Sequence, residues 1–358
     1  MDCAILQQDN TGRIRTLQGA RFLFVVLIYL SHCVTPRTVH PFDFGGELGV
    51  AFFFTLSGFV LSWGYGPRVS RGEFKPKQFF WRHFWHFYPL NLLLFAVALA
   101  LDLRAGHCYD WMQLASSLLL VQAWIPWNHT LYNVNAVSWF LCDIIFFYAI
   151  FKWLYGWIMG LRGFGWKFVA FAVAYCIVAC NVPKDMVNCT LYANPLLRSV
   201  DFALGIVVYR QYKTRQLMTF SRRNARFELL AWLFAFWILY NAYQWLDGNG
   251  LRCAALFWPF VPTLVIALAV ADGTRGVMAR LLASRLMVWL GGISFEFFMV
   301  HLLAMRLTQH CIRFEATAEG DMEYYLVSFF VTVVLACVLH SCFVKPIAGT
   351  INRHLSRS

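Results

Sequence analysis

Charged side chains are scarce in this sequence. Asp, Glu, Lys and Arg make up 13% of its 358 residues, whereas 60% are hydrophobic and 18% are aromatic. A water-soluble protein of this composition would expose more apolar surface than its polar side chains could cover. The composition therefore excludes an ordinary soluble fold and predicts a surface that faces lipid.

The sequence also lacks internal repeats, low-complexity tracts and linkers long enough to separate domains. We therefore expect one membrane domain over residues 1–358, with cytoplasmic tails at 1–16 and 344–358. The 11 cysteines lack the paired spacing of a metal site, so no metal is expected. Two of them, Cys108 and Cys189, fall in predicted outer loops, where an oxidising compartment would allow a disulfide and free thiols are the alternative.

Long apolar stretches recur along the chain. A helix needs about 20 mostly apolar residues to cross a bilayer. Ten stretches qualify: 17–36, 47–66, 84–103, 137–156, 166–182, 195–212, 227–246, 254–272, 286–308 and 323–343. A shorter one, 111–125, we interpret as interfacial or re-entrant. The sequence thus predicts an all-α, polytopic membrane protein with about ten transmembrane helices.

The distribution of basic residues predicts the orientation of these helices, because basic loops stay in the cytoplasm. With the N-terminus inside, 21 of the 30 Lys and Arg residues lie in inner segments and five in outer ones. We therefore expect both termini in the cytoplasm. The net charge of +12 then reflects topology and contact with anionic lipid, and nucleic acid is not expected as a partner. Four basic residues fall inside predicted spans: Arg21, Lys152, Arg198 and Arg306.

Ionisable groups inside a span are costly and are usually functional or tightly paired. Arg21 and His32 lie eleven positions apart in the first span, so they share one helical face and are separated by roughly 16 Å along the axis. Arg82, His83 and His86 lie together at the inner start of the third span. The simplest interpretation is that these long side chains extend to the membrane interface and keep their charges in water. Guanidinium groups at this end of the span would also bind a phosphorylated ligand.

Further polar residues occur in later spans. Ser57 precedes Gly58 in the second span, where small residues permit close helix packing. Arg198 precedes an acid by three residues, a spacing that allows pairing on a helix. The candidates for substrate binding or support are Ser57, Asp143, Arg198, Asp201, Glu296 and His301.

Six segments, in this order, resemble the acyltransferase 3 family of membrane-bound acyltransferases, which transfer acetyl and related acyl groups to sugars and other acceptors. They are RIRTLQGARFLFVVLIYLSH, GVAFFFTLSGFVL, WRHFWHFYPL, WFLCDIIFFY, NPLLRSVDFALG and GGISFEFFMVHLL. The chain departs from the family pattern at four positions. Gln18 and Ala51 stand where many members carry Asp, His86 replaces an Arg, and Ile144 replaces a common Glu.

The resemblance implies an O-acyltransferase, most simply an O-acetyltransferase, that moves an acyl group from cytoplasmic acetyl-CoA or another acyl-CoA to a hydroxyl of a glycan or lipid-linked sugar. It implies a multi-pass protein of a bacterial plasma membrane. His32 is the expected catalytic residue, as general base or covalent acyl carrier. Arg21 and Arg82, with His83 and His86, are expected to bind the donor, and His301 to lie near the acceptor. The alternatives are a transporter that uses the same intramembrane groups, and a structural or sensory membrane protein.

Overall fold

The computed structural model describes residues 14–33, 43–214, 225–246, 249–274 and 276–355, and every regular element in these ranges is helical. The predicted tail residues 1–13 and 356–358, and residues 34–36 of the first predicted span, lie outside them. The helices are α1 (Arg15–Ser31), α2 (Gly45–Ser70), α3 (Pro76–Arg104), α4 (Trp111–Leu119), α5 (Asn128–Leu131), α6 (Trp139–Gly160), α7 (Phe164–Asn181), α8 (Pro195–Lys213), α9 (Ala225–Trp245), α10 (Phe260–Ala271), α11 (Val277–Leu282), α12 (Arg285–Gly292), α13 (Ser294–Cys311), α14 (Ala318–Leu339) and α15 (Lys345–Leu355).

Helices of membrane-spanning length and composition are present. Among the described residues, four are long and apolar enough to cross a bilayer by themselves: Gly45–Ser70, Pro76–Arg104, Ala136–Gly160 and Ala318–Thr350. The number rises to six if each of two bent helix pairs forms one span. The all-helical membrane fold is therefore confirmed, whereas the count of ten and the positions of the termini remain predictions.

Two of the predicted spans are not single straight helices. The segment 286–308 is divided at Ile293 into α12 and α13, which meet at 63°. The segment 254–272 begins with short 3₁₀ turns and contains only the 12-residue α10. Hydropathy averages over such breaks, so continuous apolar composition did not reveal them. The stretch 111–125 forms the nine-residue α4 and a 3₁₀ turn, too short to cross a bilayer.

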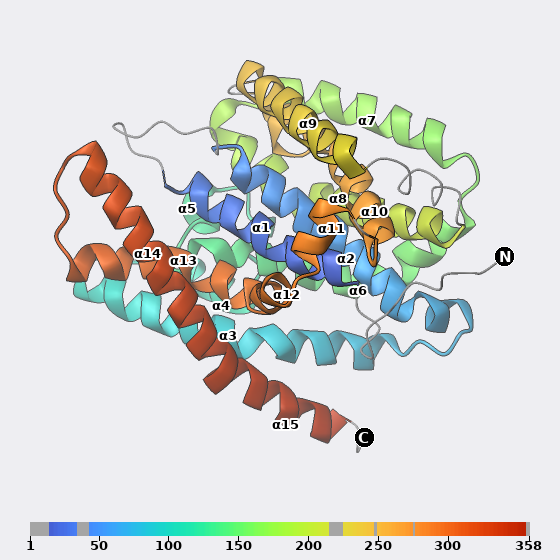
Figure 1. Ribbon diagram of the computed structural model, residues 1–358. Coiled ribbons are helices and arrows are strands. Elements are labelled where there is room, and N and C mark those ends of the chain that lie inside the picture. Colours follow the sequence, from blue (N-terminus) through green and yellow to red (C-terminus); the bar gives the residue numbers. More distant parts are fainter. Residues whose placement is uncertain (1–13, 34–42, 215–224, 247–248, 275, 356–358) are drawn as a thin grey trace.

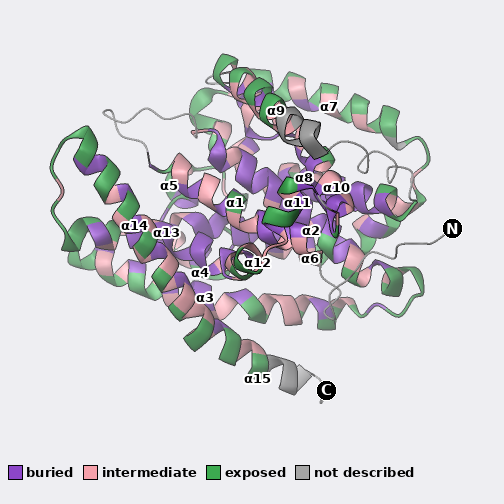
Figure 2. Cartoon of the chain, viewed as in Figure 1, coloured by how far each residue is buried: buried purple, intermediate pink, exposed green. Residues whose placement is uncertain are grey.

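The first two helices lie in the middle of the molecule. Figure 1 shows α3 along one side of α1 and α2, and α7 and α9 along the opposite side. Buried residues are concentrated on the central helices, while α7, α9 and α14 carry many exposed ones (Figure 2). Several exposed side chains on these outer helices are large and apolar, among them Ile177, Trp237 and Phe330. Such a surface is what lipid contact requires.

The close contact between α2 and α8 depends on two glycines. A methyl group at Gly58 would overlap the backbone carbonyl of Phe202, and one at Gly205 would overlap the carbonyl of Thr55. The helices therefore approach each other at the backbone, as small residues allow in membranes. The sequence interpretation of Gly58 as a packing residue is confirmed. This contact fixes the position of Ser57, next along α2.

Candidate active site

Two histidines meet at the end of α1. The His32 ring follows the last residue of α1, and its centroid lies 5.1 Å from that of His301 on α13, with the ring planes at 64°. His301 is fully buried, whereas His32 is exposed. The fold thus brings together two predicted site residues that are far apart in the sequence.

Each histidine is oriented by a backbone carbonyl of its own helix. The Nδ1 atom of His32 lies 2.8 Å from the Ile28 oxygen, and that of His301 lies 2.6 Å from the Phe298 oxygen. A carbonyl oxygen only accepts, so a neutral imidazole in this arrangement carries its proton on Nδ1 and leaves Nε2 as an acceptor. The Nε2 of His301 is buried and makes no hydrogen bond with any described residue. Both rings are therefore set up to accept a proton at Nε2.

Arg21 lies in the wall of a cavity of about 180 Å³, which we call the Arg21 cavity. Ser57, His86, Ile144 and Phe298 also line it, and Arg21 Nη1 lies 3.5 Å from the Gln18 side-chain oxygen. Arg21 is half-buried and faces this cavity. The cavity combines a guanidinium, an imidazole and a hydroxyl with an aromatic lining.

Arg82 lines a different cavity, formed by the end of α2 and the start of α3. This Arg82 cavity has a volume of about 260 Å³, and Arg68 and Lys75 contribute to its wall. The buried Nε of Arg82 makes no hydrogen bond with any described residue. Glu73 also lines the cavity, but the three cationic side chains outnumber it, so the wall carries a net positive charge suited to an anion. The structure therefore separates Arg82 from Arg21, which the sequence placed at one common mouth.

The third cavity lies beyond the two histidines along α13. This Arg306 cavity has a volume of about 300 Å³ and includes Asp102, Tyr109 and Asn135 in its wall. Arg306 forms an ion pair with Asp102 across it. The expectation that an intramembrane arginine is tightly paired is thus confirmed for Arg306. Its partner was not recognised in the sequence, because spacing along the chain does not reveal contacts between α3 and α13.

The nearest lining residues of successive cavities lie one helical turn apart. On α3, Arg82 lines the first cavity and His86 the second. On α13, Phe298 lines the second cavity and Leu302 the third. Residues four apart lie on one helix face, about 6 Å from each other along the axis. The cavities therefore follow each other in the order Arg82, Arg21, Arg306.

Histidines stand at both boundaries between cavities. The His83 ring lies 5.0 Å from that of Tyr148, which lines the Arg21 cavity, and 4.2 Å from that of Phe79, which lines the Arg82 cavity. At the other boundary, His301 lies between Phe298 and Leu302 in the chain and contacts His32. His32 and His301 line none of these three cavities.

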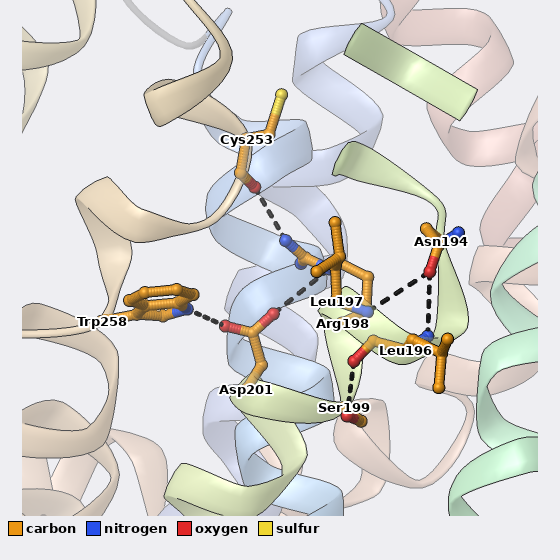
Figure 3. Close-up of polar contacts among 8 residues, drawn as sticks. All are labelled: Asn194, Leu196, Leu197, Arg198, Ser199, Asp201, Cys253 and Trp258. Atoms are coloured by element: carbon orange, nitrogen blue, oxygen red, sulfur yellow. Dashed lines mark hydrogen bonds and ion pairs between the residues drawn. The ribbon is translucent and has the colours of Figure 1, made fainter. Parts of the chain in front are cut away.

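Arg198 and Asp201 form a buried network away from these cavities (Figure 3). The ion pair that their spacing predicted is present, with Nε and Oδ2 3.2 Å apart. Arg198 also donates to the Cys253 carbonyl at 2.8 Å, and Trp258 donates to Asp201 at 2.9 Å. Asp143 is buried, and its carboxylate makes no hydrogen bond with any described residue. The contacts of Arg198 and Asp201 support a role in holding α8 to the 250–258 segment.

Glu296 contacts a residue that the sequence analysis missed. Its carboxylate accepts a hydrogen bond from His340 Nδ1 at 2.8 Å, in a π-helical turn (His340–Val344) that follows α14. No contact with His301 is recorded, in agreement with the helical geometry expected for residues five apart. A lone histidine in an apolar span is the signal that could have marked His340. Cys108 and Cys189 are both free thiols.

Residues 14–341 match the acyltransferase domain that defines the acyltransferase 3 family. The chain belongs to the acyltransferase 3 family. It is similar to Acyltransferase MdmB of Streptomyces mycarofaciens, with 28% identity over 379 residues that cover 95% of this chain and 93% of the relative. No solved structure matches the chain. Membership makes the protein an acyltransferase, and the resemblance seen in six sequence segments is confirmed.

Three of the four positions that depart from the acyltransferase 3 pattern can now be placed around Arg21. Gln18 contacts Arg21, and His86 lines the Arg21 cavity. Ile144 lines the same cavity, whereas its neighbour Asp143 is not part of that wall. Successive residues on a helix point about 100° apart, so Asp143 does not take over the place of the family's glutamate.

Proposed function

We propose that the protein is a transmembrane O-acyltransferase, most simply an O-acetyltransferase, that moves an acyl group from cytoplasmic acyl-CoA to a hydroxyl of a glycan or lipid-linked sugar. The observation that carries the proposal is the sequence of three cavities, with the His32–His301 pair beside the boundary between the last two. A donor entering from one end and an acceptor from the other would meet at these imidazoles.

The Arg82 cavity is assigned to the 3′-phosphate of the donor nucleotide. Arg68, Lys75 and Arg82 supply positive charge there, and Arg82 has a buried donor without a partner among the described residues. Arg21, in the next cavity, is assigned to the diphosphate. His32 lies eleven residues further along α1, roughly 16 Å away along the axis. This separation suits a long thin arm between the phosphates and the thioester.

His32 is assigned as general base. Its Nδ1 is held by the Ile28 carbonyl, so Nε2 accepts the proton of the acceptor hydroxyl as the oxygen attacks the thioester carbonyl. The new C–O bond forms, the C–S bond breaks, and the CoA thiolate takes up the proton from the imidazolium. A covalent acyl-imidazole at the same nitrogen is the alternative. His301 supports the first ring through the contact at 5.1 Å.

A transferase of this kind is expected in a bacterial plasma membrane, which the Streptomyces relative supports. The test is label transfer by the protein in nanodiscs. Radiolabelled acetyl-CoA should give labelled glycan in a mixture of cell-envelope oligosaccharides. Transport of an intact solute in liposomes without any acyl transfer would support the transporter alternative and contradict the proposal.

The donor site has its own test. Charge-assisted hydrogen bonds contribute about 1.5–3 kcal/mol, so Arg82→Ala should raise the Kd for acetyl-CoA roughly ten- to hundredfold. Arg68→Ala and Lys75→Ala should also weaken binding. Lys77→Ala is the matched control, because Lys77 is exposed and is not part of the cavity wall. Unchanged affinity in the three cavity variants would remove this site from donor binding.

A further inference from the structure

The Arg306 cavity has a distinctive arrangement of charge. Asp102 is 4% exposed in its side chain, and its two oxygens are occupied: Arg306 contacts Oδ1, and the Tyr109 hydroxyl donates to Oδ2 at 2.6 Å. Tyr109 keeps its proton at neutral pH, because burial and the Asp102 carboxylate raise the pKa of its hydroxyl to about 12. The carboxylate is thus neutralised and fixed, and it offers no strong site to a ligand cation.

Donors remain available on the other side of the ion pair. A guanidinium carries five N–H groups, and Asp102 engages Arg306 through Nη2. The side chain of Arg306 is 44% exposed, so its other donors are accessible. An anion would be attracted less strongly here than in the Arg82 cavity, because the Asp102 charge lies in direct contact with the guanidinium. Neutral acceptor groups are therefore favoured as ligands.

Asn135 provides a second polar contact in the same wall. It is 7% exposed, yet within the described part of the chain its side-chain amide makes no hydrogen bond. Its neighbour Asn133 differs, because its amide donates to the Gln113 carbonyl at 2.9 Å and accepts from Ser117. The amide atoms of Asn135 keep some accessible surface, so they are open to the cavity. A ligand hydroxyl, which both donates and accepts, matches such an amide.

The size and lining of the cavity suit a small ring. Its volume of about 300 Å³ is at the lower end of ligand cavities. The partly exposed aromatic side chain of Tyr132 lines it together with the polar groups. A sugar ring presents hydroxyl groups at its edge and C–H groups on its face, and so matches both kinds of surface.

We propose that the Arg306 cavity binds one uncharged sugar unit of the acceptor, with Asn135 and Arg306 hydrogen-bonded to its hydroxyl groups. This inference rests on the proposed function and specifies its acceptor site. Leu302 and Leu303 line the cavity and directly follow His301, so a bound sugar would lie within one helical turn of His301 along the axis of α13. The neutralised Asp102–Arg306 pair selects uncharged sugars over sugar phosphates and uronic acids.

The experiment measures CoA release from acetyl-CoA by the full-length protein in nanodiscs. The uncharged probes are methyl α-glucopyranoside, methyl β-galactopyranoside and methyl α-rhamnopyranoside, and the charged probes are glucose 6-phosphate and glucuronate. At least one uncharged glycoside should stimulate CoA release at concentrations at which neither charged sugar does. Equal stimulation by a charged sugar would overturn the selection of uncharged ligands.

The assignment of Asn135 is tested with the stimulating glycoside. Asn135→Leu removes the amide at similar size and should raise the half-saturating glycoside concentration roughly tenfold, because one net hydrogen bond is worth about 1 kcal/mol or more. Asn135→Asp, which replaces the N–H donors with a carboxylate oxygen and adds a negative charge, provides a second variant. The Kd for acetyl-CoA should stay the same in both, which also shows that they fold. Asn181→Leu, at an exposed position on α7, is the matched control.

The outcomes distinguish failure of the sugar subsite from failure of the proposed acyltransferase function. If the wild-type protein binds acetyl-CoA and acylates envelope glycans but no uncharged glycoside stimulates CoA release, the sugar subsite is wrong and the proposed function stands. An unchanged half-saturating concentration in both Asn135 variants also overturns the subsite. Absence of acetyl-CoA binding and of any acyl transfer contradicts the proposed function itself.

Discussion

Replacement of His32 by alanine should separate catalysis from folding. The side chain is exposed at the end of α1, and its recorded hydrogen bond is to Ile28 in the same helix. Loss of that bond should change the free energy of unfolding by about 1 kcal/mol. Loss of a general base should lower acetyl transfer by about 10²–10⁴-fold, which corresponds to roughly 3–5 kcal/mol in the activation barrier.

The assay is transfer of labelled acetyl from acetyl-CoA to acceptor, with thermal unfolding of the same sample in detergent as the measure of folding. His310→Ala is the matched control, since His310 is an exposed histidine near the end of α13. An acid quench before acceptor is added distinguishes the two roles of His32, because only an acyl carrier retains label on the protein. Wild-type turnover of His32→Ala, or an equal loss in His310→Ala, would refute the assignment.

Three further predictions concern stability. Gly58→Ala should lower the melting temperature, because a methyl group there overlaps a backbone carbonyl of α8. Gly64→Ala on the same helix should leave the melting temperature unchanged, because no atom lies within 4 Å of the added carbon. Equal effects of the two substitutions would contradict the packing account. Asp201→Asn should destabilise the protein by about 3–5 kcal/mol, since it leaves a buried arginine without its charge partner; a melting temperature within a degree of wild type would be inconsistent with this. The pKa of Tyr109 is raised from 10 to about 12, so its contribution to stability is complete below pH 10 and falls as pH rises through 12. The melting temperature of Tyr109→Phe should lack that pH dependence. An equal fall in the melting temperatures of wild type and variant would assign the pH dependence to another group.

The sequence predicted the fold class and the order of the helices because both depend on local composition. Apolar stretches of spanning length and the helical spacing of Arg198 and Asp201 are properties of neighbouring residues. Among the described residues, four to six spans and the Arg198–Asp201 ion pair have their counterpart in the structure. The bend at Ile293 was not predicted, because the hydropathy of the whole segment outweighed the signal of Gly291 and Gly292, which directly precede it.

The candidate site was only partly predictable. Arg21, His32 and His301 stood out as polar groups in apolar segments, but their arrangement depends on contacts between helices. The sequence therefore placed Arg21 and Arg82 at one mouth, whereas the structure shows them in successive cavities. Polar residues at helix ends, such as Asp102, were not predicted as site residues. Such positions are ordinarily solvated, and the sequence does not indicate which of them are buried.

The order of the three cavities can be tested most directly by a structure of the protein with a non-hydrolysable acetyl-CoA analogue bound. The account predicts the 3′-phosphate of the nucleotide beside Arg68, Lys75 and Arg82, the diphosphate beside Arg21, and the acyl group within reach of His32. A nucleotide bound in the Arg306 cavity, or an acyl group at the opposite end of the molecule from the two histidines, would contradict it.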